Sequence, residues 1–335
     1  MSENINLLFR EGMNEKISEI KKENPNAKFY SISRLNNFNQ CKRGYYYTYI
    51  DKKEQKSGVY STLGSAAHSD LEDLYEGKVD ELLPQHFNEE WIKCELFGIK
   101  FPSNKIKENY KKDLDAFYKI YKKDQGKYIS ELGFILQIDN NSYIMGYIDL
   151  LQIHDDGSVS ISDFKTSSAF ATPKKLQHAG RQLCLYQLSM EQLYGLKVVS
   201  NEWIMLKYVE VQIGNNKPKI VSTREWVSKC ESQLKTLMKK SGMDSFLIDM
   251  YLLEAKKNNN VEGLPEEIKS KVFVKIQCRK YEITEEIRQE TLLYVKETIN
   301  AIENMEKDIE KWDCSVDKFF CQHLCGFYPK NCNPI

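Results

Sequence analysis

An Asp-Phe-Lys tripeptide near the middle of the chain has the clearest chemical potential in the sequence. It lies in SVSISDFKT, where apolar and polar residues alternate as in a β-strand, so Asp163 and Lys165 point to one face and Phe164 to the other. Two strand steps put the two side chains about 7 Å apart. At that separation the carboxylate can hold a divalent cation against phosphate oxygens, while the ammonium orients the attacking water and offsets developing charge. The tripeptide therefore indicates phosphodiester hydrolysis, although taken alone it is more typical of an ion pair at a strand end.

Further polar residues occur in order around this tripeptide. Asp149 interrupts the apolar run GYIDLL and needs a partner if it is buried, and Glu131 lies on the strand before it. His68 lies on a helix upstream, one residue away from that helix's apolar stripe. Gln182 and Tyr186 are four residues apart on a downstream helix, so both can face a cleft over the strands. Each of two residues also has a purely structural interpretation. His68 could be an ordinary helix histidine, and Tyr186 could be a core residue.

The elements that must position these side chains follow from the period of the apolar residues. A helical period gives way to a strand period near residue 129 and returns near residue 172, which predicts a mixed α/β core. The expected elements are a helix capped by Ser31 or Ser33, helices at 61–77 and 103–127, strands at 129–138, 142–154 and 158–166, a helix at 172–195 closed by Gly195, a strand at 197–213, a helix at 224–240, a strand at 272–278 and a helix at 284–312.

Composition narrows the class of protein. The 335 residues carry 48 basic and 48 acidic side chains, so any surface that binds a polyanion must be local. With 41% hydrophobic and 29% charged residues, the chain is neither disordered nor fibrous. The N-terminal stretch lacks an apolar signal region, and no apolar run is long enough to cross a bilayer, so we expect a cytoplasmic protein, bacterial or phage-encoded.

Two basic stretches have both a DNA-binding and a structural interpretation. Residues 103–127 carry eight Lys against four acidic residues, which suits a phosphate backbone but also a solvated helix face. The aromatic run Tyr45-Tyr46-Tyr47 follows Lys42 and Arg43, so these side chains either stack on bases or pack inside the protein.

The ordered motifs GSAAHSDLE, GYIDLL, SDFKT and QLCLY resemble the RecB-like branch of the PD-(D/E)XK nuclease superfamily. The resemblance covers roughly residues 60–210 and implies a restriction-endonuclease-like fold, with a mixed sheet flanked by helices. It makes His68, Asp149 and Asp163 ligands of Mg²⁺ or Mn²⁺ and Lys165 the catalytic lysine. Glu131 is a further acidic candidate for catalysis, and Gln182 and Tyr186 hold the substrate strand.

Nine cysteines are unlikely as a disulfide framework in a reducing compartment, which leaves metal ligation or burial. The RecB-like branch includes an iron-sulfur subgroup, among it CRISPR-associated and AddB-type exonucleases, with one ligand before the nuclease motifs and three at the C-terminus. The resemblance therefore implies a [4Fe-4S] cluster that joins the two ends of the chain through Cys41, Cys321, Cys325 and Cys332. Four thiolates also suit Zn²⁺, and Cys314 is an alternative ligand.

The resulting expectation is a metal-dependent DNA nuclease that acts on single strands or free ends in repair, recombination or phage replication. The expected organisation is an N-terminal segment at 1–60, a nuclease core at 61–215 and a helical region at 216–335. No P-loop motif occurs, so unwinding would require a helicase or recombinase partner, and a homo-oligomer stays open. The alternatives are a catalytically weak DNA-binding module that docks on such a partner or on CRISPR-adaptation machinery, and a zinc-stapled protein with a coincidental Asp-x-Lys.

Overall fold

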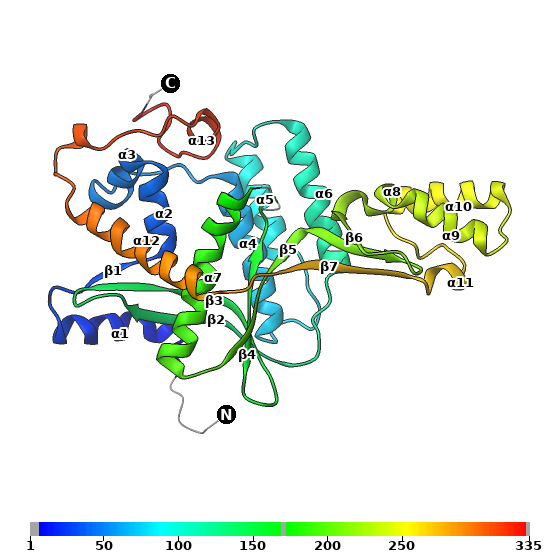
Figure 1. Ribbon diagram of the computed structural model, residues 1–335. Helices are drawn as coiled ribbons and strands as arrows, with labels where there is room; N and C mark the ends of the chain where they lie inside the picture. Colours follow the sequence, from blue (N-terminus) through cyan, green and yellow to red (C-terminus); the bar gives the residue numbers. More distant parts are fainter. Residues whose placement is uncertain (1–6, 169–171, 333–335) are drawn as a thin grey trace.

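The computed structural model describes residues 7–168 and 172–332 (Figure 1). Within these residues, seven strands form one mixed sheet. They are β1 (Lys28–Tyr30), β2 (Lys127–Gln137), β3 (Ser142–Ile153), β4 (Val159–Lys165), β5 (Val198–Ile213), β6 (Lys219–Ser222) and β7 (Val272–Lys280). Strand β3 pairs in parallel with β1 and antiparallel with β2 and β4. Strand β5 pairs in parallel with β4 and antiparallel with β6 and β7.

Helices cover both faces of this sheet (Figure 1). The longer ones are α1 (Arg10–Glu23), α2 (Ile32–Gln40), α4 (Val59–Tyr75), α5 (Gln85–Leu96), α6 (Asn104–Ile120), α7 (Pro173–Tyr194), α9 (Glu231–Lys240), α10 (Ser245–Asn258) and α12 (Glu285–Glu303), and the short ones are α3 (Lys42–Tyr45), α8 (Trp226–Lys229), α11 (Glu266–Lys269) and α13 (Lys318–His323). The prediction of a mixed α/β core with helices on both sides is confirmed.

Alternation along the strands divides the core in two. Phe164 and Ile204 point toward α4, α5 and α6, whereas Ile161 and Met205 point toward α2, α7 and α12. Because strand side chains alternate between faces, Asp163 and Lys165 share the face of Ile161, which is covered by α7. The predicted orientation of the tripeptide is therefore confirmed.

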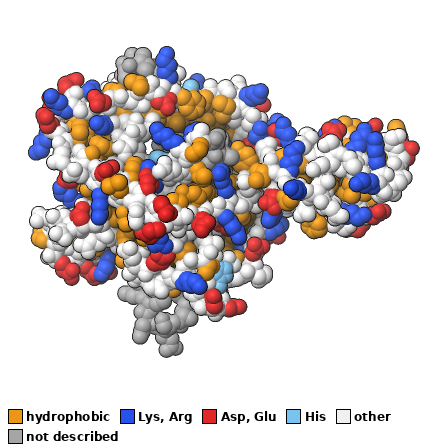
Figure 2. Space-filling view, in the orientation of Figure 1, with side chains coloured by type: hydrophobic (Ala, Val, Ile, Leu, Met, Phe, Trp, Pro, Cys, Tyr) orange, Lys and Arg blue, Asp and Glu red, His pale blue; other side chains and the backbone are white. Residues whose placement is uncertain are grey.

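The far ends of β5 and β7 leave the main body together with β6. They lead to α8, α9, α10 and α11, which project as an arm to one side (Figures 1 and 2). The sheet thus takes β1, β6 and β7 from outside the predicted nuclease core at 61–215, and the three-part division of the chain stays a prediction.

Two predicted helices end earlier than expected. The helix expected at 284–312 ends at Glu303, after which the chain folds back and Trp312 Nε1 donates a hydrogen bond to the carbonyl of Glu306 at 2.8 Å. Trp312 is thereby buried in a stacked contact with Tyr45, at 6.0 Å between ring centroids. The helix expected at 103–127 ends at Ile120, since Tyr121 is extended and β2 begins at Lys127. Both helices end where tertiary packing requires it, and the spacing of apolar residues along the sequence does not predict such packing.

The local caps agree with the sequence. The Ser31 side chain accepts a hydrogen bond from Arg34 N at the start of α2, and Gly195 ends α7 with φ 64°, a left-handed conformation that glycine adopts at little cost. None of the described helices is long and apolar enough to span a membrane.

Candidate active site

Three carboxylates occupy one row across β2, β3 and β4. Ser130 and Leu132 pair with Leu150 and Ile148, which brackets Glu131 against Asp149. Leu150 pairs with Ser162, so the register continued by one residue sets Asp149 beside Asp163. Asp149 and Asp163 face α7, because side chains in register on neighbouring strands point the same way. Glu131 has φ 51°, a conformation that is uncommon outside glycine, so the backbone of β2 is distorted at this position.

Asp149 is anchored at the point where β3 and β4 separate. Its Oδ2 accepts a hydrogen bond from Phe164 N at 2.9 Å and lies 3.4 Å from His68 Nδ1. Burial and the negative charge of Asp163 raise the pKa of Asp149 well above its usual range. A cation between the two carboxylates would offset both effects.

Asp163 is almost completely buried, with 1% of the residue exposed. Its Oδ2 lies 2.5 Å from Lys165 Nζ, but within the described residues neither carboxylate oxygen has a partner in hydrogen-bond geometry. Buried carboxylate oxygens are normally hydrogen-bonded, because their desolvation is costly. The Asp163 oxygens can therefore still accept a bond at this place, as the oxygens of a metal ligand must.

A hydrogen-bond chain connects the lysine to α7. Lys165 Nζ donates to Gln182 Oε1 at 3.0 Å, and Gln182 Nε2 donates to Tyr186 OH at 2.6 Å. The Tyr186 ring is buried edge-on against Phe134, at 5.7 Å between centroids, while its pKa is raised by burial and by the charges of Asp149 and Asp163. Tyr186 is therefore a core residue whose hydroxyl also reaches the carboxylate row.

His68 comes from α4, on the other side of the sheet. Its ring meets that of Phe164 edge-on at 5.9 Å, and burial lowers its pKa. A neutral imidazole is the form that binds metal ions. The structure thus brings His68, Asp149, Asp163 and Lys165 together with the Gln182–Tyr186 pair.

Arg10 joins this site from the start of α1. Its Nη2 lies 2.9 Å from Glu131 Oε2, and its Nη1 lies 3.5 Å from Glu72 Oε1 on α4. Burial raises the pKa of Glu131, and the hydrogen bond from Arg10 works against that shift. No sequence pattern pointed to Arg10, because it lies far from every motif and reaches the site only through tertiary structure.

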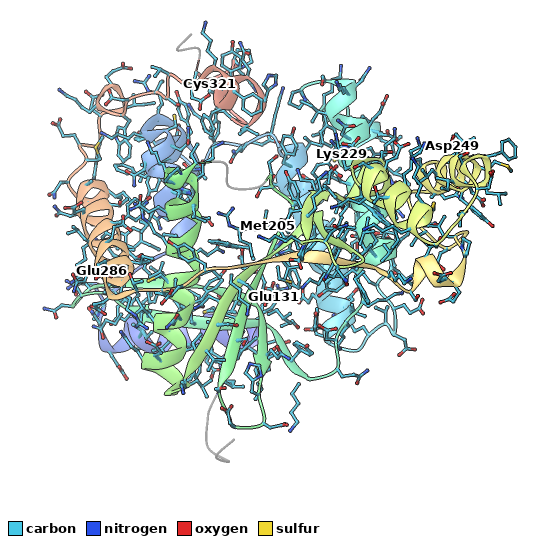
Figure 3. The ribbon with its side chains drawn as sticks, turned by 45° about the vertical axis from the view of Figure 1, so that its right-hand side comes forward. Glu131, Met205, Lys229, Asp249, Glu286 and Cys321 are labelled. Carbon is cyan, nitrogen blue, oxygen red and sulfur yellow. The ribbon has the colours of Figure 1, made fainter. Side chains whose placement is uncertain are left out.

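The site lies in the middle of the main body. Figure 3 labels Glu131 of β2 and Met205 of β5, the strands on either side of β3 and β4, and Met205 is the β5 partner of Lys165. In the space-filling view, the surface is hollowed near the centre of the main body, with acidic and basic side chains around the hollow (Figure 2).

No three His, Cys, Asp or Glu side chains in residues 7–168 and 172–332 are arranged in the geometry of a metal site. The donor chemistry nevertheless fits Mg²⁺ or Mn²⁺. Two carboxylates and one imidazole converge, the Asp163 oxygens have free acceptor capacity, and these hard ions prefer oxygen ligands.

Five cysteines gather where the C-terminal segment meets α2 and α3, namely Cys41, Cys314, Cys321, Cys325 and Cys332. Cys314 Sγ lies 2.9 Å from Cys332 Sγ. The pKa of Cys332 is raised by burial, by its hydrogen bond to Cys314 and by the neighbouring thiols. The pKa of Cys321 is raised by burial and by the same group of thiols. Five thiols in one neighbourhood fit a four-thiolate cluster in type and provide one sulfur more than it needs.

Hydrogen bonds connect the C-terminal segment to α3 and the turn after it. Arg43 N donates to the carbonyl of Asp313 at 3.0 Å, Arg43 Nε to that of Trp312 at 2.9 Å, and Tyr47 OH to that of Asn331 at 2.9 Å. These protein contacts hold the C-terminal segment against the N-terminal helices.

The tyrosine run is mainly structural. Tyr45 is fully buried and accepts a hydrogen bond from Arg34 Nε at 2.8 Å, and Tyr47 is 5% exposed and packs on Phe327. Base stacking by Tyr45 and Tyr47 is excluded by this burial, and the packing alternative holds for both.

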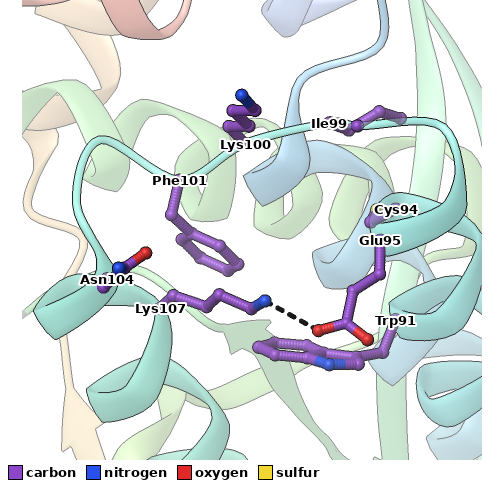
Figure 4. Close-up of a pocket in the computed structure, with 9 residues that line it drawn as sticks. Trp91, Cys94, Glu95, Ile99, Lys100, Phe101, Asn104 and Lys107 are labelled. Atoms are coloured by element: carbon purple, nitrogen blue, oxygen red, sulfur yellow. Dashed lines mark hydrogen bonds and ion pairs between the residues drawn. The ribbon is translucent and has the colours of Figure 1, made fainter.

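A separate pocket of about 350 Å³ lies between α5 and α6 (Figure 4). Trp91, Phe101 and Cys94 line it, and Lys107 Nζ spans it to Glu95 Oε1 at 2.7 Å. It contains none of the residues of the carboxylate row.

Comparison with known families gives a match over most of the chain. The model of the PD-(D/E)XK nuclease superfamily matches residues 30–327, which include every residue described around the carboxylate row except Arg10. Comparison with curated proteins gives no match.

Proposed function

Because the chain belongs to the PD-(D/E)XK nuclease superfamily, we propose that it is a metal-dependent exonuclease that hydrolyses phosphodiester bonds in single-stranded DNA or at DNA ends. The observation that carries the proposal is the convergence of Asp149, Asp163 and Lys165 on one face of the sheet, where the buried Asp163 is ion-paired with Lys165 but has no hydrogen-bond partner among the described residues. Repair, recombination or phage replication is the setting, with a helicase or recombinase as the partner that supplies unwound strands.

Asp149, Asp163 and His68 would hold the divalent ion. When bound, Mg²⁺ or Mn²⁺ supplies a Lewis acid that polarises the scissile phosphate and makes water more acidic. Lys165 orients the attacking water and places its ammonium charge where negative charge develops on the phosphate. Gln182 positions Lys165 through the hydrogen bond at 3.0 Å.

The remaining polar groups have supporting roles. Gln182 and Tyr186 help to hold the substrate strand over the carboxylate row. Glu131 contributes a further negative charge to the site, and Arg10 stabilises it. By holding the strand, Gln182 and Tyr186 keep the reacting phosphate in place, which lowers the entropic part of the barrier.

A [4Fe-4S] cluster held by Cys41, Cys321, Cys325 and Cys332 belongs to the same proposal. The proximity of these thiols to one another supports it, because burial together with the neighbouring thiols raises the pKa of Cys321, Cys325 and Cys332. Because hydrolysis transfers no electrons, the cluster serves as a staple between the two ends of the chain.

The test is the cleavage of end-labelled single-stranded DNA by anaerobically purified protein, with Mn²⁺ or Mg²⁺ and with chelator. Wild type is expected to cut only with metal, Lys165→Ala to lose the activity, and the exposed-lysine control Lys22→Ala to keep it. If wild type binds single-stranded and duplex DNA but cuts neither, catalysis by this chain is refuted and the DNA-binding module replaces it.

A further inference from the structure

A groove begins immediately after the candidate catalytic lysine. It has a volume of about 540 Å³, and its lining includes Thr166 and Ser168 after β4, Lys207 of β5, Tyr60 of α4 and Phe319 of α13. Thr166 follows Lys165 directly, so the groove begins one residue after the candidate catalytic lysine, on the α4 and α6 side of the sheet, whereas Asp163 and Lys165 face α7. Helix α13 also carries Cys321, labelled in Figure 3, so the C-terminal cysteine segment supplies one wall.

Lys207 is the surplus cation of this groove. The neighbouring Asp113 is engaged by Arg224, whose Nη1 lies 2.7 Å from Asp113 Oδ2, and by the Thr223 hydroxyl at 3.0 Å. No carboxylate of the described residues forms an ion pair with Lys207, which contacts the face of the Tyr110 ring at 5.3 Å. Its pKa is lowered by burial, so an anion in the groove would relieve the cost of keeping its charge there.

The other walls offer aromatic rings and hydroxyls. Phe319 is 52% exposed, although large apolar side chains are normally covered, and the ring of Tyr60 also lines the groove. The hydroxyls of Thr166, Ser167 and Ser168 add hydrogen-bond donors at the end nearest Lys165. A cation combined with exposed rings is the arrangement that binds single-stranded nucleic acid, in which phosphates meet the cation and bases stack on the rings.

We propose that this groove holds the DNA strand on one side of the scissile phosphate, with Lys207 at a backbone phosphate and Phe319 stacked on a base. This inference rests on the proposed nuclease function and names the substrate of the same site as a single strand. Bases must be unpaired to stack on a protein ring, so duplex DNA cannot use the groove in the same way.

The test measures binding without cleavage. A fluorescently labelled oligothymidylate is titrated with full-length protein in chelator, and anisotropy gives the Kd at several salt concentrations. The variants are Lys207→Met and Phe319→Ala, with Lys207→Arg as the charge-preserving variant. The matched controls are Lys105→Met on the exposed face of α6 and Phe246→Ala on the arm, where Phe246 is 70% exposed.

The expected results separate charge from packing. Phe319→Ala is expected to weaken binding by roughly 5- to 100-fold, the effect of losing one stacked base. Lys207→Met is expected to weaken binding and to reduce the slope of log Kd against log salt by about 0.7, the value for one phosphate contact on a single strand. Lys207→Arg and both controls are expected to bind like wild type.

The inference is overturned if wild type does not bind the oligonucleotide, or if both groove variants bind it with wild-type affinity and salt slope. Cleavage of bis(p-nitrophenyl) phosphate with Mn²⁺, by wild type and by Phe319→Ala, separates this outcome from failure of the proposed function. That small diester does not reach along the groove, so hydrolysis by both proteins with unaltered DNA affinity refutes the groove alone. Absence of hydrolysis by wild type refutes catalysis, while the binding data still decide the groove.

Discussion

Lys165 Nζ donates a hydrogen bond to Gln182 Oε1 at 3.0 Å, so the last residue of β4 is fixed by the helix that follows it in the chain. The same amide donates to Tyr186 OH, and its orientation is therefore determined on both sides. A lysine held in this way needs little reorganisation before it acts on a phosphate.

Replacement of Gln182 by Ala is expected to lower kcat on single-stranded DNA by roughly 10- to 100-fold, the cost of removing a group that positions a catalytic residue. KM should change much less, because Lys165 stays in the site but is no longer oriented. Gln192→Ala on the exposed side of the same helix is the matched control. A Gln182→Ala enzyme with wild-type kcat and a raised KM would instead assign Gln182 to substrate binding alone.

Loss of a cluster ligand is the second prediction. Cys325→Ala and Cys41→Ser are expected to lack iron and visible colour and to unfold at a lower temperature, since the two ends of the chain are then joined by protein contacts alone. Metal analysis and thermal denaturation measure both effects, with Cys278→Ala as a control outside the cysteine group. A colourless wild type that contains zinc would support the zinc staple, and unchanged stability in Cys325→Ala would refute the structural role.

Asp70 gives a stability prediction that does not involve the active site. Its buried carboxylate accepts hydrogen bonds from His86 N at 2.8 Å and Phe87 N at 3.1 Å, at the start of α5, and from Tyr118 OH at 2.6 Å. Asp70→Ala leaves these donors without an acceptor and is expected to lower the free energy of unfolding by about 3 kcal/mol. Urea denaturation tests this, with the exposed Asp80→Ala as control. A loss below half of that value would show that water replaces the carboxylate.

The pair of His86 and Asp73 predicts a pH dependence of stability. His86 Nε2 lies 2.9 Å from Asp73 Oδ2, and this hydrogen bond raises the pKa of His86 above 6.5. Burial opposes a low pKa of Asp73, but hydrogen bonds from Lys78 and His86 outweigh it and hold the pKa below 3.8. The stabilisation by protonated His86 is complete below pH 6.5 and is lost as the pH rises through the folded-state pKa of His86. The stabilisation by ionised Asp73 is lost as the pH falls through the folded-state pKa of Asp73.

The stability difference between wild type and His86→Gln should therefore be largest between about pH 4 and 6.5 and should shrink at higher pH. Thermal midpoints of the two proteins across this range measure it. A difference that grows above pH 7 would contradict the assignment.

The sequence predicted the parts of the site that lie on regular elements. The strand period fixed the faces of Asp163 and Lys165, and the spacing of Gln182 and Tyr186 placed both on one side of α7, as observed. Both features depend on local geometry, which the spacing of residues along a strand or helix predicts directly. The contact of Asp149 with Phe164 N needed the strand register in addition, and the sequence placed Asp149 only on a neighbouring strand.

Features built by distant segments were not predictable in the same way. Arg10 reaches Glu131 from the N-terminal part of the chain, and Phe319 of the C-terminal part lines the same groove as Tyr60. Neither has a local pattern, because its place depends on how α1 and α13 pack. The same reason explains why the helix expected to reach Trp312 ends at Glu303, since burial of Trp312 against Tyr45 outweighs continuation of the helix.

The most direct test of the central claim is metal-dependent cleavage of labelled single-stranded DNA by Asp163→Asn. Asn keeps the size of the side chain and removes the charge that would hold the metal ion. The exposed Asp155→Asn, in the turn between β3 and β4, is the control. The account predicts that wild type and Asp155→Asn cut the strand as Mn²⁺ is added and that Asp163→Asn, though folded, does not do so at any Mn²⁺ concentration tested. Cleavage by Asp163→Asn at the wild-type rate would contradict the account.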